Sequence, residues 1–169
     1  DPRYLTREWT PGCDWVRDGE GIATRKYNGT CVMLDDSRKW WARRQVKIGK
    51  NPPDGFVAVE TDEETGTVVG YEPIEQSAFA KWFAKVIGKP TVTGTFELYG
   101  PKINGNPENV SEHLLIRHEM AQTFDDAPRD WDALRNWLHD RKHEGIVWHH
   151  EDGRMAKIKA RDFAERKNG

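Results

Sequence analysis

The sequence predicts an α+β fold, in which antiparallel sheets are covered by helices on their outer sides. Three observations predict it. Segments that alternate apolar and polar residues, or that are rich in β-branched residues, recur along the 169 residues and outnumber helical segments. Most of these segments follow one another through short, hairpin-like links. No internal repeat or long linker divides the chain, so we expect a single domain over residues 1–169.

The expected strands are the segments with period-two or β-branched character. They cover residues 21–27, 30–34, 39–48, 56–61, 67–74, 91–100, 145–150 and 155–163. Residues 61–66, "TDEETG", and residues 150–155, "HEDGRM", are expected to form hairpin loops. The pair Asn28-Gly29 stands between the first two strands and is a strong two-residue turn signal.

Helical periodicity is clearest in residues 77–88, where the large apolar side chains fall on one stripe. That stripe consists of Phe79, Trp82, Phe83, Val86 and Ile87. Ser77 can cap the start of this helix and Gly88 can end it. Residues 111–120 and 129–143 predict weaker helices of the same kind.

The composition is that of an ordinary water-exposed protein, with 32% charged and 36% hydrophobic residues and a net charge of −2. No apolar run is long enough to span a membrane, and no signal peptide opens the chain. Cys13 and Cys31 have no metal-binding spacing and are expected to be reduced thiols. We therefore expect an intracellular, cytoplasmic protein without membrane partners.

Basic residues gather in two stretches. Residues 38–50 contain six Lys or Arg and no acid, and residues 153–163 contain four against one Asp. Such stripes can attract phosphates, although a solvated strand face is the commoner explanation. Trp40 and Trp41 in the first stretch could stack bases. On a strand one of the two must point inward, so one core and one surface tryptophan is the favoured interpretation.

Five short motifs follow one another in order. They are Lys26 in "KYNG", Arg43 in "WAR", Glu97 in "FELYG", Glu144 in "HEGIVW", and Lys157 with Lys159 in "KIK". Each alone has a plain structural explanation, such as a lysine beside a turn or a cross-strand ion pair. The set and its order are much less expected by chance.

This order resembles the covalent nucleotidyltransferases, which comprise ATP-dependent RNA and DNA ligases and mRNA-capping guanylyltransferases. The resemblance covers about residues 19–163, and "WARRQVK" and "YGPKINGNP" are most similar to the small 5′-3′ RNA ligases with viral and vertebrate members. It implies a nucleotidyltransferase (adenylation) domain, in which two antiparallel sheets form a cleft for ATP with flanking helices.

The resemblance implies that Lys26 attacks ATP and carries AMP as a lysyl-AMP intermediate. A lysine amine attacks only in its neutral form, which nearby cations favour. Lys157 and Lys159 would supply those cations and stabilise phosphate charge in the transition state. Alternation puts both on one face of a strand, with Ile158 turned into the core.

The remaining roles also come from the resemblance. Glu144 is expected to hold Mg²⁺, with Mn²⁺ as an alternative, and Glu97 to contact the ribose hydroxyl or the waters of the metal. Arg43 is expected to contact ribose or phosphate, although Arg44 is adjacent. The nucleotide-binding residues expected from the first motif are Arg25, Lys26, Asn28 and Gly29.

The sequence departs from the family pattern at two of these positions. Asn28 stands where the family usually has Asp, and Arg25 where an acidic residue is common. An aromatic residue that would stack on adenine is not evident between Glu97 and Glu144. The four-residue spacing of His139 and His143 also matches two zinc ligands, but no cysteine is near them.

The resemblance implies an RNA ligase that joins 5′-phosphate and 3′-hydroxyl RNA ends in three steps, with RNA repair as the expected role. A viral origin would place it in the host cytoplasm. The sequence ends ten residues after Lys159, so we expect no C-terminal OB-fold domain of the kind that continues DNA ligases and capping enzymes. Those enzymes remain alternatives, as does a non-catalytic RNA-binding module on the same fold.

Overall fold

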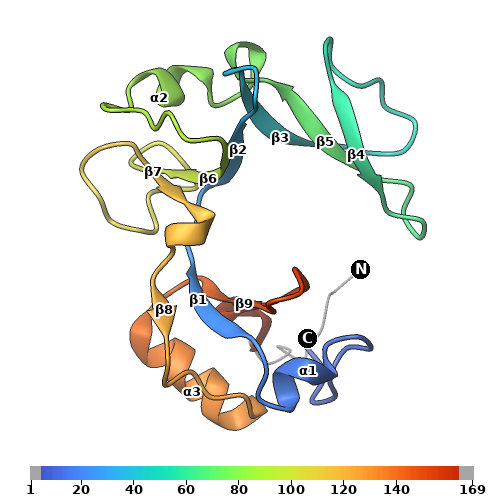
Figure 1. The fold of residues 1–169 in the computed structure, drawn as a ribbon, viewed down its shortest axis with the longest axis vertical. Helices are drawn as coiled ribbons and strands as arrows, with labels where there is room; N and C mark the ends of the chain where they lie inside the picture. The colour runs from blue at the N-terminus through green and yellow to red at the C-terminus, as the bar shows by residue number, and fades with distance from the viewer. Residues whose placement is uncertain (1–4, 164–169) are drawn as a thin grey trace, which may run out of the picture. The chain divides into compact units, whose positions relative to one another are not determined.

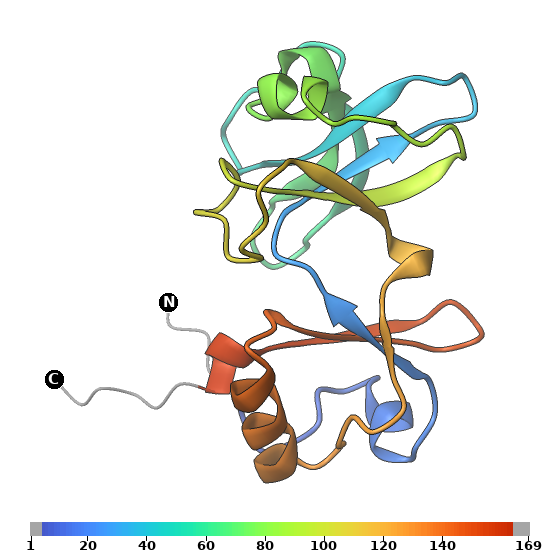
Figure 2. The same ribbon diagram turned by 90° about the vertical axis from the view of Figure 1, so that its left-hand side faces the viewer.

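A computed structural model describes residues 5–163 of the chain. It divides the chain into two compact units (Figures 1 and 2). Unit 1 combines the segments up to Tyr27 and from Ala121 onward, and unit 2 is the continuous segment Asn28–Met120. Each unit contains one antiparallel sheet, so the expectation of a mixed fold with two antiparallel sheets is confirmed. Whether the two units make up one domain stays a prediction.

Unit 1 is built around a four-stranded sheet with the order β10-β9-β1-β8. Its elements are α1 (Asp14–Arg17), β1 (Ile22–Lys26), β8 (Thr123–Phe124), α3 (Trp131–Arg141), β9 (Gly145–His149), β10 (Met155–Lys159) and the 3₁₀ helix η3 (Ala160–Phe163). The hairpin expected between the last two strands is present at residues 150–155.

The core of unit 1 lies between α3 and one face of the sheet. Leu134 and Leu138 of α3 are buried with Ile146 and Trp148 of β9. The helix starts where the Asp130 carboxylate accepts hydrogen bonds from two backbone N–H groups of the first turn, and such a cap contributes about 1 kcal/mol. Because Ile146 and Trp148 face the core, Gly145, Val147 and His149 lie on the other face of β9.

Unit 2 is built around a six-stranded sheet with the order β4-β5-β3-β2-β6-β7. Its elements are β2 (Thr30–Leu34), β3 (Trp40–Val46), β4 (Val57–Thr61), β5 (Val68–Pro73), η1 (Ile74–Gln76), α2 (Ala80–Ala84), β6 (Gly94–Tyr99), β7 (Leu114–Arg117) and η2 (His118–Met120). The expected hairpin at residues 61–66 joins β4 and β5.

The core of unit 2 forms on one face of this sheet. Val32, Ala42 and Phe96 are buried there, and Phe83 of α2 packs against them. Trp40 lies beside the same core, with its ring centroid 5.0 Å from that of Phe83.

Each of the eight expected strand segments contains a strand, but the one expected at residues 155–163 ends at Lys159, because Ala160–Phe163 forms η3. Two helix predictions were also wrong in extent or type. Residues 111–120 form β7 and η2 instead of a helix, because Leu114–Arg117 pairs with the edge of β6. In residues 77–88 only α2, five residues long, is α-helical. Ser77 does not cap it; its hydroxyl donates to the Ile74 carbonyl instead.

The prediction of a two-residue turn at Asn28-Gly29 was also wrong. β1 and β2 belong to different sheets, so this pair leads the chain from one sheet to the other. Gly29 has another reason to be glycine: a Cβ there would lie 2.1 Å from the Leu98 carbonyl oxygen. The close approach of two backbones, and not a tight turn, therefore requires it.

Among residues 5–163, no helix combines the length and the apolar character needed to cross a membrane.

Candidate functional site

Two strands of unit 1, β1 and β10, present three lysines on one face of its sheet. Gly145 of β9 pairs with both Lys26 of β1 and Lys159 of β10, and Val147 pairs with Lys157. Directly paired residues of antiparallel strands point to the same face, as do residues two apart on one strand. Lys26, Lys157 and Lys159 therefore share a face. The predicted alternation within the "KIK" motif is confirmed, because Ile158 packs against the core.

Lys26, Gly145 and Lys159 form one cross-strand row, and the residue at its centre, Gly145, has no side chain. A Cβ on Gly145 would lie 2.0 Å from the Ile158 carbonyl oxygen, so only glycine fits there. Lys26 and Lys159 sit on either side, about two strand spacings or roughly 10 Å apart at the backbone. The two lysines thus flank a position where the backbone of β10 passes directly over the glycine.

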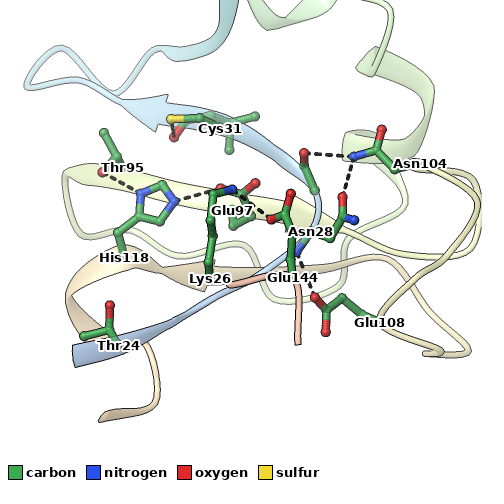
Figure 3. A network of polar contacts seen from close by, with 12 residues as sticks. Thr24, Lys26, Asn28, Cys31, Thr95, Glu97, Asn104, Glu108, His118 and Glu144 are labelled. Carbon is green, nitrogen blue, oxygen red and sulfur yellow. Dashed lines mark hydrogen bonds and ion pairs between the residues drawn. The ribbon is translucent and has the colours of Figure 1, made fainter. Parts of the chain in front are cut away.

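Lys26 contacts Glu144 directly, as Figure 3 shows. Its Nζ lies 2.8 Å from Oε2 of Glu144, and the two side chains are 21% and 15% exposed. Glu144 immediately precedes β9, so its side chain is not bound by the alternation of that strand. The structure thereby brings together the predicted nucleophile and the predicted metal ligand, which are 118 positions apart in the sequence.

The surroundings of the row shift the pKa of Lys159. Burial lowers the pKa of its ammonium group, and the positive charges of Arg161 and Lys26 lower it further. The carboxylates of Glu144 and Asp162 act in the opposite direction. Lys26 is therefore close enough to Lys159 for its charge to disfavour the charged form of Lys159.

Arg25 is not part of this face. It pairs with Ile146, so it lies on the side of β1 opposite to Lys26. Its guanidinium lies over the Tyr27 ring, 4.5 Å from the ring centroid. Its predicted contact with a nucleotide stays a prediction.

Unit 2 carries Arg43 and Glu97 on the side of its sheet that faces away from the core. Their neighbours Ala42 and Phe96 both pair with the buried Val32, so alternation turns Arg43 and Glu97 to the other face. Arg44 lies on the core side and forms an ion pair with the buried carboxylate of Glu72, with 3.4 Å between Nη1 and Oε1. This arrangement favours Arg43 over its neighbour as a ligand-binding residue.

Asn28 and Gly29 are held by the loop that contains the "YGPKINGNP" segment. The Asn28 backbone N–H donates to the Glu108 carboxylate at 2.8 Å. The Asn104 side-chain amide donates to Asn28 Oδ1 at 3.0 Å and to the Gly29 carbonyl at 3.1 Å (Figure 3). The loop therefore fixes the backbone directly after Lys26.

Three residues in contact with predicted site residues were missed from the sequence. Asn104 and Glu108 lie in a second Asn-Gly segment, which was a usable signal because it carried part of the resemblance. His118 contacts Glu97. It gave no signal because its segment was expected to be a helix.

Both tryptophans of the basic stretch at residues 38–50 contact other side chains of unit 2. Trp40 packs beside the core, while Trp41 donates its ring N–H to Asp35 at 2.7 Å. The Lys39 ammonium lies over the Trp41 ring, 4.3 Å from its centroid. This matches the division into one core and one surface tryptophan.

Within residues 5–163, no group of three or more His, Cys, Asp or Glu side chains could hold a metal ion. Glu144 and Glu97, the two expected metal-binding residues, therefore belong to no such group, and each lies in a different unit. A single carboxylate suits Mg²⁺, which keeps most of its waters and also binds substrate phosphates. The residues present fit a metal that arrives with a nucleotide.

Comparison with known proteins gives a partial match. Residues 83–165 match the family model of RNA ligase 1. RNA ligase 1 of Danio rerio is 31% identical over 72 residues, and RNA ligase 1 of Pongo abelii is 38% identical over 72 residues. Each alignment covers 38% of this chain and 22% of that relative. The resemblance to RNA ligases is confirmed over this part, and the chain matches about a fifth of the length of these relatives.

Proposed function

We propose that this chain, which resembles RNA ligase 1 over residues 83–165, is an ATP-dependent RNA ligase with Lys26 as its nucleophile. One observation carries the proposal. Lys26 contacts Glu144 at 2.8 Å and lies in one cross-strand row with Lys159, with a glycine between the two lysines. A row of this kind has cations for phosphates beside a lysine that can act as the nucleophile.

In the first step the neutral amine of Lys26 attacks the α-phosphorus of ATP. A bond forms between Nζ and phosphorus, and the bond from phosphorus to the bridging oxygen breaks. Pyrophosphate leaves with that electron pair, and the attacking nitrogen releases one of its two hydrogens to solvent as a proton. In the structure the Nζ of Lys26 is held by the Glu144 carboxylate. Binding of ATP must therefore loosen that contact.

Mg²⁺ would be held by Glu144, where it supplies positive charge at the phosphates and draws carboxylate charge away from Lys26. Lys157 and Lys159 would bind phosphate oxygens from their shared face. As the resemblance implies, we propose that Arg43 contacts the ribose or a phosphate of the nucleotide and that Glu97 contacts the ribose hydroxyl or the waters of the metal.

In the later steps AMP passes from Lys26 to an RNA 5′-phosphate. A neighbouring 3′-hydroxyl then attacks that phosphate and expels AMP, which joins the two ends. The RNA substrate is supported by the name of the matching relatives, and RNA repair is the role that this chemistry suits.

A basic surface of unit 2 also supports an RNA substrate. Lys81 and Lys85 of the α2 region lie over the Trp82 ring, at 4.9 and 5.3 Å from its centroid. His113 stacks on the same ring at 5.2 Å, and its Nε2 accepts the backbone N–H of Lys102. Exposed cations beside an aromatic ring suit a phosphate backbone with accessible bases.

The proposal is tested by intact-mass spectrometry after incubation with ATP and Mg²⁺. We expect the wild-type chain and Lys50→Ala, which changes an exposed lysine of unit 2, to gain one adenylyl group. Lys26→Ala should gain none, because the attacking amine is gone.

Other outcomes identify the alternatives. An adduct with GTP instead of ATP would point to a capping guanylyltransferase, and sealing of nicked DNA to a DNA ligase core. If neither ATP nor GTP gives an adduct with pyrophosphate removed, the proposal fails. A non-catalytic RNA-binding module would then be the better interpretation.

A further inference from the structure

Glu97 does not stand alone on its face of the unit 2 sheet. Its Oε2 lies 2.8 Å from Nε2 of His118, and Nδ1 of the same imidazole lies 2.9 Å from the Thr95 hydroxyl. Thr95 and Glu97 are two apart on β6 and share a face, while His118 follows β7, which pairs with β6. Figure 3 shows the imidazole between the other two side chains.

The chemistry of the three groups fixes where the hydrogens lie. An ionised carboxylate only accepts hydrogen bonds, so Nε2 of His118 must carry the hydrogen that it donates to Glu97. Nδ1 can then accept the hydroxyl hydrogen of Thr95 or donate to its oxygen, because a hydroxyl does both. Thr95 thus keeps the imidazole in one orientation, and the imidazole keeps Oε2 of Glu97 in one place.

This arrangement leaves the second carboxylate oxygen of Glu97 for a ligand. The Glu97 side chain is only 14% exposed, so it has little room to change rotamer. Its contact with the half-buried His118 restricts that rotation further. A carboxylate repels phosphates and pairs only with donors. In ATP the donors are the ribose hydroxyls and the adenine amino group.

We propose that His118 is a positioning residue that holds the Glu97 carboxylate so that its second oxygen accepts a ribose hydroxyl of bound ATP. The inference rests on the proposed function. It adds a residue outside the five motifs and gives it a definite role in nucleotide choice. His118 acts on the nucleotide only through Glu97, by the hydrogen bond that its Nε2–H group donates to that carboxylate.

Three variants separate this role from others. His118→Gln keeps a donor near the position of Nε2, His118→Phe keeps an aromatic ring without a donor, and His118→Ala keeps neither. His139→Gln changes an exposed histidine of α3 and serves as the matched control. Formation of the lysyl-AMP adduct is followed with ATP and with 2′-deoxyATP over a range of concentrations.

We expect the wild-type chain, His118→Gln and His139→Gln to prefer ATP over 2′-deoxyATP. His118→Ala and His118→Phe should lose about tenfold of that preference, because a hydrogen bond to a charged group is weakened. The loss should lie mainly in KM for ATP, since the ribose lies away from the reacting phosphorus.

Three outcomes overturn the inference. An unchanged preference for ATP over 2′-deoxyATP in His118→Ala shows that Glu97 does not have to be positioned by His118. A preference kept by His118→Phe and lost in His118→Gln shows that the ring itself contacts the nucleotide. If the wild-type chain forms no adduct with either nucleotide, the proposed function fails and this inference falls with it. The first two outcomes leave the proposed function intact.

Discussion

Lys159 illustrates how a single residue of the site can oppose the stability of the fold. Burial and two neighbouring cations lower its pKa, so its charged form is disfavoured in the folded protein. The unfolded chain binds the proton more tightly, and the free energy of unfolding therefore rises as the pH increases from the lowered value towards the ordinary value of 10.5. At neutral pH the protein bears the full cost of that charge.

Lys159→Met should therefore stabilise the protein while it removes a predicted phosphate-binding cation. Methionine fills a similar volume without a charge, and we expect the midpoint of thermal unfolding at pH 7.5 to rise by roughly 1–3 °C. Lys157→Met changes the exposed lysine of the same strand and should leave the midpoint unchanged. A lower midpoint in Lys159→Met would show that the charge is not a cost to the fold.

Single residues of the candidate site could be predicted where they belong to a recognisable sequence motif. Lys26 and Glu144 were predicted from motif order, and the structure joins them. His118 could not be predicted, because its contact with Glu97 depends on how β7 pairs with β6. A histidine in a segment without strand periodicity carries no sign of its partner.

Among the elements of unit 2, the loop between β6 and β7 is fixed against α2 by His113. This histidine is buried, stacks on Trp82, and accepts the Lys102 backbone N–H on Nε2. Gly100 lies against it so closely that a Cβ would be 2.7 Å from the imidazole. Burial lowers the pKa of His113, and the charges of Lys85 and Lys102 add to that effect.

Acid should therefore loosen this loop. Because the pKa of His113 is below its ordinary value of 6.5 in the folded protein, the unfolded chain binds more protons just below that pH, and the free energy of unfolding falls as the pH drops. Urea unfolding at pH 7.5 and 5.5 measures the effect.

His113→Gln is the comparison for that experiment. It keeps an acceptor for Lys102 but cannot titrate, so we expect it to lose less stability than the wild-type chain between the two pH values. An equal loss in both proteins would show that other groups account for the acid sensitivity.

Elements were predictable where periodicity and pairing agree. The strands with clear alternation are present, and α3 has the cap and stripe of an ordinary helix. Residues 111–120 have a helical pattern but become a strand, because the edge of β6 offers backbone hydrogen bonds to Leu114–Arg117. Tertiary pairing overrides local propensity there.

At the scale of the whole molecule, each unit has a hydrophobic core of its own. Unit 2 is continuous in the sequence, from Asn28 to Met120, and contains all six strands of its sheet. We expect a fragment of residues 28–120 to fold alone, because domains with their own core and few chain crossings do so. Cooperative unfolding by circular dichroism would confirm it.

A fragment of residues 121–163 is the matched control. It contains β8, β9 and β10 but lacks β1, which lies between β8 and β9 in the sheet. We expect no cooperative transition from it. A non-cooperative 28–120 fragment would show that unit 2 depends on the rest of the chain.

The division into two sheets could not be predicted from the sequence. Asn28-Gly29 indicated a hairpin between neighbouring strands, whereas β1 pairs with β8 and β9 and β2 pairs with β3 and β6. Nothing local distinguishes these pairings, because both flanks of the pair have strand character. The partners of β1 lie about a hundred residues further along the chain.

The pairing of β1 with β9 also sets the order of events during synthesis. Unit 2 is complete when the ribosome has passed Met120, but Lys26 then still lacks Glu144, Gly145 and Lys159. Long-range strand pairing is slow to form, because a large loop must close first. We therefore expect a nascent chain to hold Lys26 without its charged neighbours until β10 has emerged. If Lys26 is the nucleophile that we propose, it would become reactive towards ATP only as the last strand joins the sheet.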